Sequence, residues 1–209
     1  RQYAGRGMGN TTWHSEADKN LACSFLFKPV FLEPGQQFTL NKCIAVAVCQ
    51  ALTDLVPGCH FKIKWPNDIY FESKKIAGTL IENQIMGRAF ELCVAGVGIN
   101  INQLKFPAEI PNPVSLSCIT GKSYNLKSCL ESLSNRMYLG YEALKSGKAD
   151  TINEQYLHHL LGMNEELTFA KGDNFFKGII TGVNEYGHLV VKVNNTTKSF
   201  EMKEISFVF

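Results

Sequence analysis

The segment Lys64-Trp65-Pro66-Asn67-Asp68 stands between two short stretches that are rich in apolar residues. Residues 59–64 alternate apolar and polar side chains, and residues 69–71 are apolar or aromatic, so both stretches are predicted to be β-strands. Proline, asparagine and aspartate favour turns. The segment therefore predicts a tight turn between two strands, with an amide and a carboxylate side chain at one rim of a sheet.

Working outward, a second pair of strands is expected at residues 76–84 and 90–97, hinged at Met86-Gly87-Arg88. A short apolar run predicts one more buried strand at residues 21–27. Apolar residues at helical spacing predict three helices, at residues 38–56, 126–144 and 152–161. Prolines predict an irregular surface loop at residues 105–115. The first part of the chain should thus combine a sheet with helices.

From Glu166 onward every expected element is a strand, at residues 167–169, 175–183, 188–193, 199–202 and 205–209. Such a run of short strands has the size of a small barrel. We therefore expect two domains, residues 1–162 and 163–209, with a boundary near Gly162. Because the chain begins at Arg1 without a methionine, we also expect it to be N-terminally truncated.

The composition excludes several classes of protein. Hydrophobic residues make up 45% of the 209 residues and charged residues 19%, as in globular rather than disordered proteins. A net charge of +2 argues against binding nucleic acid by bulk electrostatics, and no apolar run approaches the ~20 residues of a membrane span. The seven cysteines are an odd number without a Cys-x-x-Cys pair, which favours a reducing cytoplasm, and the dispersed histidines suggest no metal site.

Three segments carry candidate chemistry. In Gly5-Arg6-Gly7-Met8-Gly9 the backbone N–H groups can approach a carboxylate or phosphate and Arg6 adds a cation, although a solvated surface loop has the same pattern. The side chains of Asn67 and Asp68 can bind a ligand or can simply stabilise their own turn. Lys75 can be a functional cation, or its ammonium can simply extend to water from an apolar strand. Glycines in the strand that ends Gly96-Val97-Gly98-Ile99-Asn100 mark close approach by a ligand or by a packed helix.

The order of these segments is more specific than any one of them. A glycine and arginine loop that ends at Trp13 is followed by Lys-Trp-Pro-Asn-Asp, by Lys-Ile-Ala-Gly-Thr-Leu-Ile-Glu at residues 75–82, and by Gly-x-Gly-Ile-Asn. This order resembles the biotin protein ligases. The β-rich tail from Leu167 is similar to the small C-terminal domain of that family, so the resemblance covers nearly the whole chain.

The resemblance implies an enzyme that joins biotin to ATP, forming biotinyl-5′-AMP and pyrophosphate, and then transfers biotin to a specific lysine of a carboxylase biotin carrier domain. The implied fold is α+β, with helices on a class II aminoacyl-tRNA synthetase-like mixed or antiparallel sheet and a small SH3-like β-barrel at the C-terminus. ATP and Mg²⁺ are the implied cofactors. Biotin and a biotin carboxyl carrier protein are the implied partners, with no nucleic acid and no membrane, and a homodimer is left open.

The resemblance also implies a role for each matching residue. The catalytic residues are Lys75, Arg6 and Asp68: the two cations neutralise the reacting anions, and Asp68 orients the incoming lysine amine. The biotin-binding residues are Gln2, Gly5, Arg6, Gly7, Met8 and Lys75. The ATP-binding residues are Arg6, Trp13, Asn67, Lys75 and Asn100. No protein residue is implied as a metal ligand, since Mg²⁺ usually bridges the phosphates of ATP.

The chain departs from the family in its first residues. Many members carry Gly-Arg-Gly-Arg-Arg-Gly-Arg before the tryptophan, whereas Met8, Gly9, Asn10 and Thr11 stand here, so we expect the adenylate to be held less tightly. The family's Ser/Thr-Thr-Asn segment would lie upstream of Arg1. Two alternatives therefore stay open: a lipoate or octanoate protein ligase, which shares the catalytic fold, and a biotin-binding module without turnover.

Overall fold

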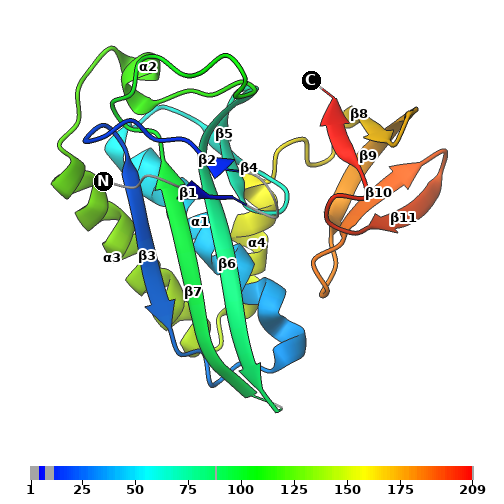
Figure 1. The fold of residues 1–209 in the computed structure, drawn as a ribbon. Helices are drawn as coiled ribbons and strands as arrows, with labels where there is room; N and C mark the ends of the chain where they lie inside the picture. The colour runs from blue at the N-terminus through cyan, green and yellow to red at the C-terminus, as the bar shows by residue number, and fades with distance from the viewer. Residues whose placement is uncertain (1–4, 8–11, 88, 209) are drawn as a thin grey trace.

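In the computed structural model, which describes residues 5–7, 12–87 and 89–208, two five-stranded sheets and four α-helices make up most of the chain (Figure 1). The first part contains β1 (Gly5–Arg6), β2 (Thr12–Trp13), β3 (Leu21–Phe27), η1 (Pro34–Gln36), α1 (Gln37–Leu55), β4 (Phe61–Lys64), β5 (Asp68–Phe71), β6 (Lys74–Met86), β7 (Ala89–Ile99), α2 (Leu116–Thr120), α3 (Leu126–Lys145) and α4 (Ala149–His159). The second part contains β8 (Glu166–Lys171), β9 (Asn174–Val183), β10 (Leu189–Val193), β11 (Thr196–Phe200) and β12 (Ser206–Val208).

The main sheet has the strand order β3-β7-β6-β5-β4, and each of its neighbouring strands pairs antiparallel. Of the two sheet types expected, the antiparallel one is therefore observed. The long hairpin of β6 and β7 forms the centre, where Gly78 faces Gly98 and Leu80 faces Gly96. Gly78, Gly96 and Gly98 share one face of the sheet with Leu80, and their missing side chains make room there.

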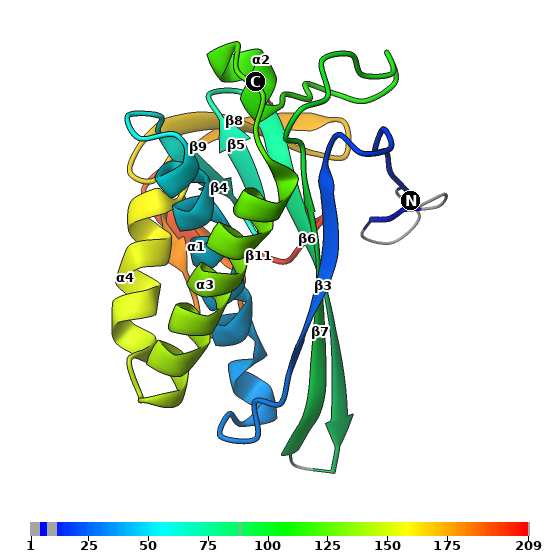
Figure 2. The same ribbon diagram turned by 90° about the vertical axis from the view of Figure 1, so that its left-hand side faces the viewer.

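The helices α1, α3 and α4 cover the opposite face of the main sheet, and the β1–β2 ribbon lies over the glycine-bearing face (Figure 2). Alanine, valine, cysteine and leucine fill α1, and most of that helix is buried in the core. The expectation that no apolar run approaches the length of a membrane span was wrong, because the segment Pro34–Leu55 is long and apolar enough by length and composition. Its packing against α3, α4 and the sheet marks it as the core helix of this fold.

The expected elements of the first part are confirmed with small shifts at their ends, and β3 begins and ends at the predicted residues. The sequence did not predict the short helix α2. Its ends are nevertheless marked locally: the Ser115 hydroxyl accepts a hydrogen bond from the Cys118 amide at 3.1 Å, and Gly121 ends the helix at φ 71°. Five residues are too few for a helical period to be visible in the sequence.

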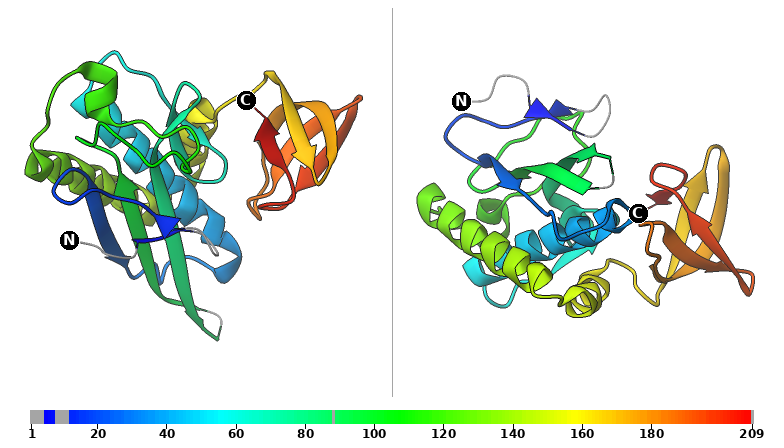
Figure 3. Two further views of the ribbon diagram at one scale, coloured as in Figure 1. Left: turned by 45° about the horizontal axis from the view of Figure 1, so that its top comes forward. Right: turned by 90° about the horizontal axis from the view of Figure 1, so that it is seen from below.

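The second sheet, residues 166–208, is called the C-terminal module below (Figure 3). Its order is β11-β10-β9-β8-β12, so among the described strands β11 and β12 remain edges and the recorded pairings do not close a barrel. The strand expected at residues 199–202 lies earlier, at Thr196–Phe200. Asn194 and Asn195 both have positive φ, 49° and 64°, and this two-residue turn starts the next strand at once.

The C-terminal module contacts the first part of the chain around the segment that opened the sequence analysis. The Trp65 indole N–H donates to the Gly187 carbonyl at 2.9 Å. Gly187, at φ 87°, packs so closely on the Phe38 ring that an added Cβ would overlap it. The Lys64 ammonium lies 5.3 Å from the centre of the Phe207 ring. The β9–β10 turn and β12 thus flank the Trp-Pro-Asn-Asp turn.

Candidate active site

The turn at Trp65–Asp68 is held from three sides. Its Trp65–Pro66 peptide bond is cis. The Tyr156 hydroxyl, from α4, donates to the Pro66 carbonyl at 2.8 Å, and the Asn67 amide donates to the Thr79 carbonyl of β6 at 3.3 Å. Together with the bond from Trp65 to Gly187, these contacts fix where Asn67 and Asp68 stand.

Lys75 and Asp68, both predicted to be catalytic, form an ion pair. Lys75 Nζ lies 2.7 Å from Asp68 Oδ2, and the two side chains are 32% and 28% exposed. A Cβ on Gly78 would lie 3.1–3.2 Å from Asp68 Oδ1 and from the end of Lys75. The register of β5 and β6 brings Lys75 and Asp68 together. Because Gly78 has no side chain, the ion pair has room beside it.

Trp13 covers the middle of the main sheet. In the β1–β2 ribbon it stands opposite Gly5, and its indole lies against Gly98, where an added Cβ would overlap the ring. Lys75 Nζ is 5.9 Å from the centre of the indole. The glycine loop, the Lys75 strand and the Gly-x-Gly strand, which lie far apart in the sequence, therefore meet at one place.

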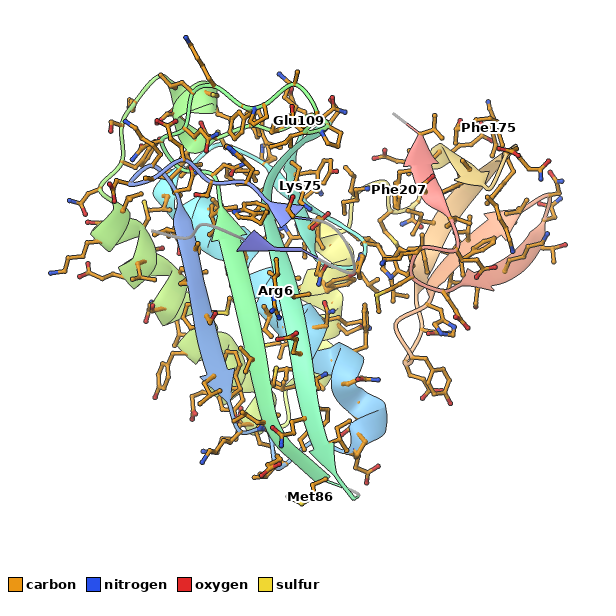
Figure 4. The ribbon with its side chains drawn as sticks, in the orientation of Figure 1. Arg6, Lys75, Met86, Glu109, Phe175 and Phe207 are labelled. Atoms are coloured by element: carbon orange, nitrogen blue, oxygen red, sulfur yellow. The ribbon has the colours of Figure 1, made fainter. Side chains whose placement is uncertain are left out.

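These residues line a cavity of about 900 Å³ on the glycine-bearing face. Of the predicted site residues, those on its wall are Arg6, Gly7, Trp13, Asn67, Asp68, Lys75 and Asn100. Figure 4 shows Arg6 over β6 and β7, and Lys75 near the start of β6. Gly5 is buried in β1 and is not on the wall. The predicted biotin-binding residues Gln2 and Met8 lie outside the described residues.

Three buried polar atoms of wall residues have no hydrogen-bond partner among the described residues: Trp13 Nε1, Thr79 Oγ1 and Asn100 Oδ1. Asn100 is 4% exposed; its amide N–H donates to the Val114 carbonyl at 3.1 Å, but its Oδ1 has no donor. The Trp13 indole N–H has no acceptor. Buried polar groups without partners are costly, so a ligand that supplies a donor to Asn100 and an acceptor to Trp13 would be favoured here.

The sequence analysis missed part of the wall. The loop at residues 105–115 was predicted to be a surface loop, yet Phe106, Ile110 and Pro113 line the cavity. The loop is tied to the site by two backbone bonds, because the Lys75 amide donates to Asn112 at 2.7 Å and the Val114 amide donates to Lys75 at 3.0 Å. Lys203 of the C-terminal module also lies on the wall. Nothing local in the sequence signals either contact, because both join residues far apart in the chain.

The charges of the site favour an anionic ligand. Among the described residues that line the cavity, Arg6, Lys75 and Lys203 carry positive charge, and Asp68 and Glu82 carry negative charge. Asp68 is already paired with Lys75. Burial lowers the pKa of the adjacent Lys64, and the Lys75 charge lowers it further, while Asp68 opposes both effects. Cations gathered on the wall of a cavity, with glycine backbone beside them, can hold a carboxylate or a phosphate.

Adding a methyl group at Gly98 should reduce ligand binding without unfolding the protein. In Gly98→Ala the new Cβ would overlap the Trp13 indole, and the two-strand ribbon would have to lift from the sheet. We expect the affinity for ligands of this cavity to fall by about tenfold, as for a lost contact worth ~1.4 kcal/mol. Thermal unfolding and tryptophan fluorescence would check the fold and the displaced ring.

Gly182→Ala is the control. Gly182 lies in β9, a Cβ there would meet nothing within 4 Å, and the residue does not line the cavity. Equal losses in the two variants would contradict a specific role for the Trp13–Gly98 contact.

Comparison with known proteins agrees with this arrangement. Residues 1–100 match the model of the biotin/lipoate A/B protein ligase family. The chain is 28% identical over 209 residues to the bifunctional ligase/repressor BirA of Bacillus subtilis, covering 98% of this chain and 63% of that protein. It is 26% identical over 199 residues to the biotin–[acetyl-CoA-carboxylase] ligase of Paracoccus denitrificans, covering 91% of this chain and 81% of that protein. The chain thus spans less than two thirds of the length of the Bacillus protein.

Solved structures share the fold as well. The biotin protein ligase of Aquifex aeolicus, in complex with biotin and ATP, superposes with a TM-score of 0.75 at 28% identity, covering 95% of this chain and 82% of that one. The family match over residues 1–100, the two relatives and this superposition agree with one another. The chain is therefore similar to the biotin/lipoate A/B protein ligase family over residues 1–100 and shares the fold of a biotin protein ligase.

Proposed function

We propose that this protein is an ATP-dependent biotin protein ligase. The observation that carries the proposal is the Lys75–Asp68 pair on the wall of a cavity that Arg6 and Trp13 also line. The Paracoccus relative is a biotin–[acetyl-CoA-carboxylase] ligase, and the Aquifex protein binds biotin and ATP, which supports the same activity for this chain.

In the first half-reaction an oxygen of the biotin carboxylate attacks the α-phosphorus of ATP. A bond from that oxygen to phosphorus forms, the bond from phosphorus to the bridging oxygen breaks, and pyrophosphate leaves with the bonding electrons. Two anions must approach each other, so the Arg6 and Lys75 cations lower the barrier by neutralising them and the charge that develops. A cavity of about 900 Å³ has room for both substrates at once.

In the second half-reaction a lysine amine of the carrier domain attacks the carbonyl carbon of the adenylate. An amide bond forms, AMP leaves, and the amine gives up a proton. Asp68 is the carboxylate beside Lys75 on the wall, and we assign it to orient the incoming amine. The acceptor is a biotin carboxyl carrier protein or domain, whose lysine must reach this wall.

The nucleotide is assigned to the part of the cavity near Trp13, Asn67 and Asn100. The Asn100 Oδ1 atom without a partner suits the exocyclic amine of adenine, and the indole supplies a flat surface for the base. The described residues hold no group of three His, Cys, Asp or Glu side chains that could bind a metal. We propose that Mg²⁺ enters with ATP and is held through the phosphate oxygens, as is usual for this cation.

The remaining assignments concern the organisation of the chain. We propose a catalytic domain at residues 1–162 and an SH3-like domain at 163–209. In the second domain, the ring centres of the contacting pairs lie 5.3–5.6 Å apart: Phe207 and Phe169, Phe169 and Phe176, Phe176 and Phe200. All seven cysteines are free, which suits the cytoplasm.

Gln2, Gly5, Gly7 and Met8 are assigned to the biotin end of the site, and a homodimer is left to measurement.

A mass measurement tests the proposed function. The protein is incubated with biotin, Mg·ATP and a biotin carrier domain, and we expect the carrier to gain the mass of one biotinyl group on a single lysine. Lipoate and octanoate replace biotin in parallel reactions, because the matched family includes lipoate ligases. Transfer of lipoate or octanoate alone would replace the proposal with a lipoate-type ligase. Biotin binding without pyrophosphate release would make the protein a binding module.

A further inference from the structure

A buried lysine lies on the helical side of the main sheet, away from the cavity. Lys42 belongs to α1, which packs beside α4 (Figure 2). Only 7% of its surface is exposed, and its ammonium donates to the side-chain oxygen of Asn153, in α4, at 2.7 Å. Among the described residues, no carboxylate lies within 4.0 Å of this ammonium. Lys42 is therefore a buried cation that the reaction described above does not use.

Two aromatic rings surround the charge of Lys42. Its ammonium lies 5.4 Å from the centre of the Phe38 ring and 5.8 Å from the centre of the Tyr156 ring. Phe38 precedes Lys42 by about one turn of α1, and its ring meets that of Tyr156 edge to face, with 6.1 Å between the centres. The face of an aromatic ring attracts a cation, most strongly where water is excluded. Lys42 thus ties a ring of α1 to a ring of α4.

The burial of this charge has a cost that packing alone does not require. An ammonium without a carboxylate loses its hydration, and burial lowers the pKa of Lys42 below its ordinary value. A methionine would fill much of the same space without that cost, since apolar replacements of buried charges are often neutral or stabilising. The charge is therefore explained by what it holds in place, rather than by the stability of the helices.

One of the two rings reaches the Trp-Pro-Asn-Asp turn. Tyr156 is fully buried, and its hydroxyl donates to the Pro66 carbonyl at 2.8 Å. Burial raises the pKa of Tyr156, so the hydroxyl keeps its proton and remains a donor. A cation beside the ring polarises the phenol and makes its O–H a stronger donor. The contact from Lys42 to Tyr156 therefore strengthens a bond that holds the turn on which Asn67 and Asp68 stand.

We propose that Lys42 is a positioning residue: its buried ammonium fixes the Tyr156 ring, so that the Tyr156 hydroxyl holds Asn67 and Asp68 in the geometry that the reaction needs. This inference rests on the proposed ligase function, in which Asn67 is assigned to the nucleotide. Lys42 does not line the cavity, so its effect on the reaction passes through Tyr156 and the turn.

The test uses Lys42→Met in the full chain, which removes the charge and keeps an unbranched side chain. Biotin-dependent exchange between pyrophosphate and ATP follows the first half-reaction without a carrier. We expect kcat/KM for Mg·ATP to fall by about tenfold, because the weakened Tyr156 bond lets the turn shift. KM for biotin should stay unchanged, and the thermal midpoint should be equal or higher. Lys145→Met, which changes an exposed lysine of α3, should match the wild type in all three measurements.

Tyr156→Phe tests whether the effect passes through the hydroxyl. This variant removes only the group that binds the Pro66 carbonyl, and it should lower kcat/KM for Mg·ATP at least as much as Lys42→Met. The double variant should lose no more than Tyr156→Phe alone, because the charge acts through a bond that is already absent.

The remaining outcomes are decisive. An unchanged kcat/KM in Lys42→Met, with a wild-type protein that does exchange, would overturn the positioning role and leave the ligase intact. A lower thermal midpoint in that same variant would make Lys42 a structural residue only. Losses that add in the double variant would also overturn the proposal, since Lys42 would then act by a route other than Tyr156. A wild-type protein without exchange would contradict the proposed function itself, and the positioning role with it.

Discussion

Alanine at Lys75 is expected to lower the rate of biotin-dependent exchange between pyrophosphate and ATP by about 10²–10³-fold, the usual effect of removing a group that stabilises transition-state charge. Lys75 Nζ is fixed 2.7 Å from Asp68 on the cavity wall, and Trp13 lies beside it. The cation is therefore already in place before substrates bind. Its removal leaves Asp68 as an uncompensated negative charge beside two anionic substrates, which adds repulsion to the lost attraction.

Lys74→Ala is the matched control for this prediction. Lys74 is the neighbouring lysine at the start of β6, is exposed, and does not line the cavity. Its replacement should leave the exchange rate within about twofold of the wild type. Because the Lys75–Asp68 pair is about one third exposed, both variants should unfold within a few degrees of the wild-type midpoint. A Lys75→Ala protein that keeps most of its exchange rate would refute the catalytic role.

Alanine at Gly187 is expected to have the largest effect on stability, lowering the free energy of unfolding by about 2–5 kcal/mol. Gly187 has φ 87°, where an L-residue costs ~1–2 kcal/mol, and its new Cβ would overlap the Phe38 ring, which adds ~1–3 kcal/mol of overpacking. The Gly187 carbonyl also accepts the Trp65 indole N–H at 2.9 Å. The module should loosen from the Trp-Pro-Asn-Asp turn, so KM for Mg·ATP should rise as well. Denaturant unfolding monitored by tryptophan fluorescence measures the stability.

Gly58→Ala separates backbone strain from the contact between the two parts of the chain. Gly58 has φ 92°, close to that of Gly187, but a Cβ there would meet nothing within 4 Å. This variant should lose only the ~1–2 kcal/mol of strain and keep the wild-type KM for Mg·ATP. If the two variants lost the same stability and the same activity, the docking of Gly187 on Phe38 would have no role in the site.

The elements that the sequence predicted best are those whose packing repeats along the chain. The strand at residues 21–27 and the helix that begins at Gln37 each show a local apolar pattern over several residues, and such a pattern follows directly from facing one core. The helix α2 was missed because five residues directly after a proline-rich loop show no period. The shifted β11 strand was misplaced because two asparagines at positive φ made a shorter turn than expected.

The candidate site also contains residues that the sequence predicted and residues that only the structure places there. Arg6, Lys75, Asp68 and the Gly-x-Gly strand were proposed from motif order, and the structure brings them to one wall. The loop at residues 105–115 and Lys203 also reach that wall, but no motif marks them. Their places depend on backbone bonds between distant segments, such as Lys75 to Asn112 at 2.7 Å, and on the docking of a separate sheet.

The sequence by itself determined the elements and the chemical groups of this protein, because periodic burial and turn residues act over a few neighbours in the chain. It also determined the family resemblance, through motifs that keep their order. Only the tertiary structure decided that Lys75 pairs with Asp68, that Trp13 rests on Gly98, and that Lys203 of the C-terminal module joins the wall. Those contacts depend on strand register, on the space left by glycines and on the docking of two sheets, which are set by the packing of the whole chain.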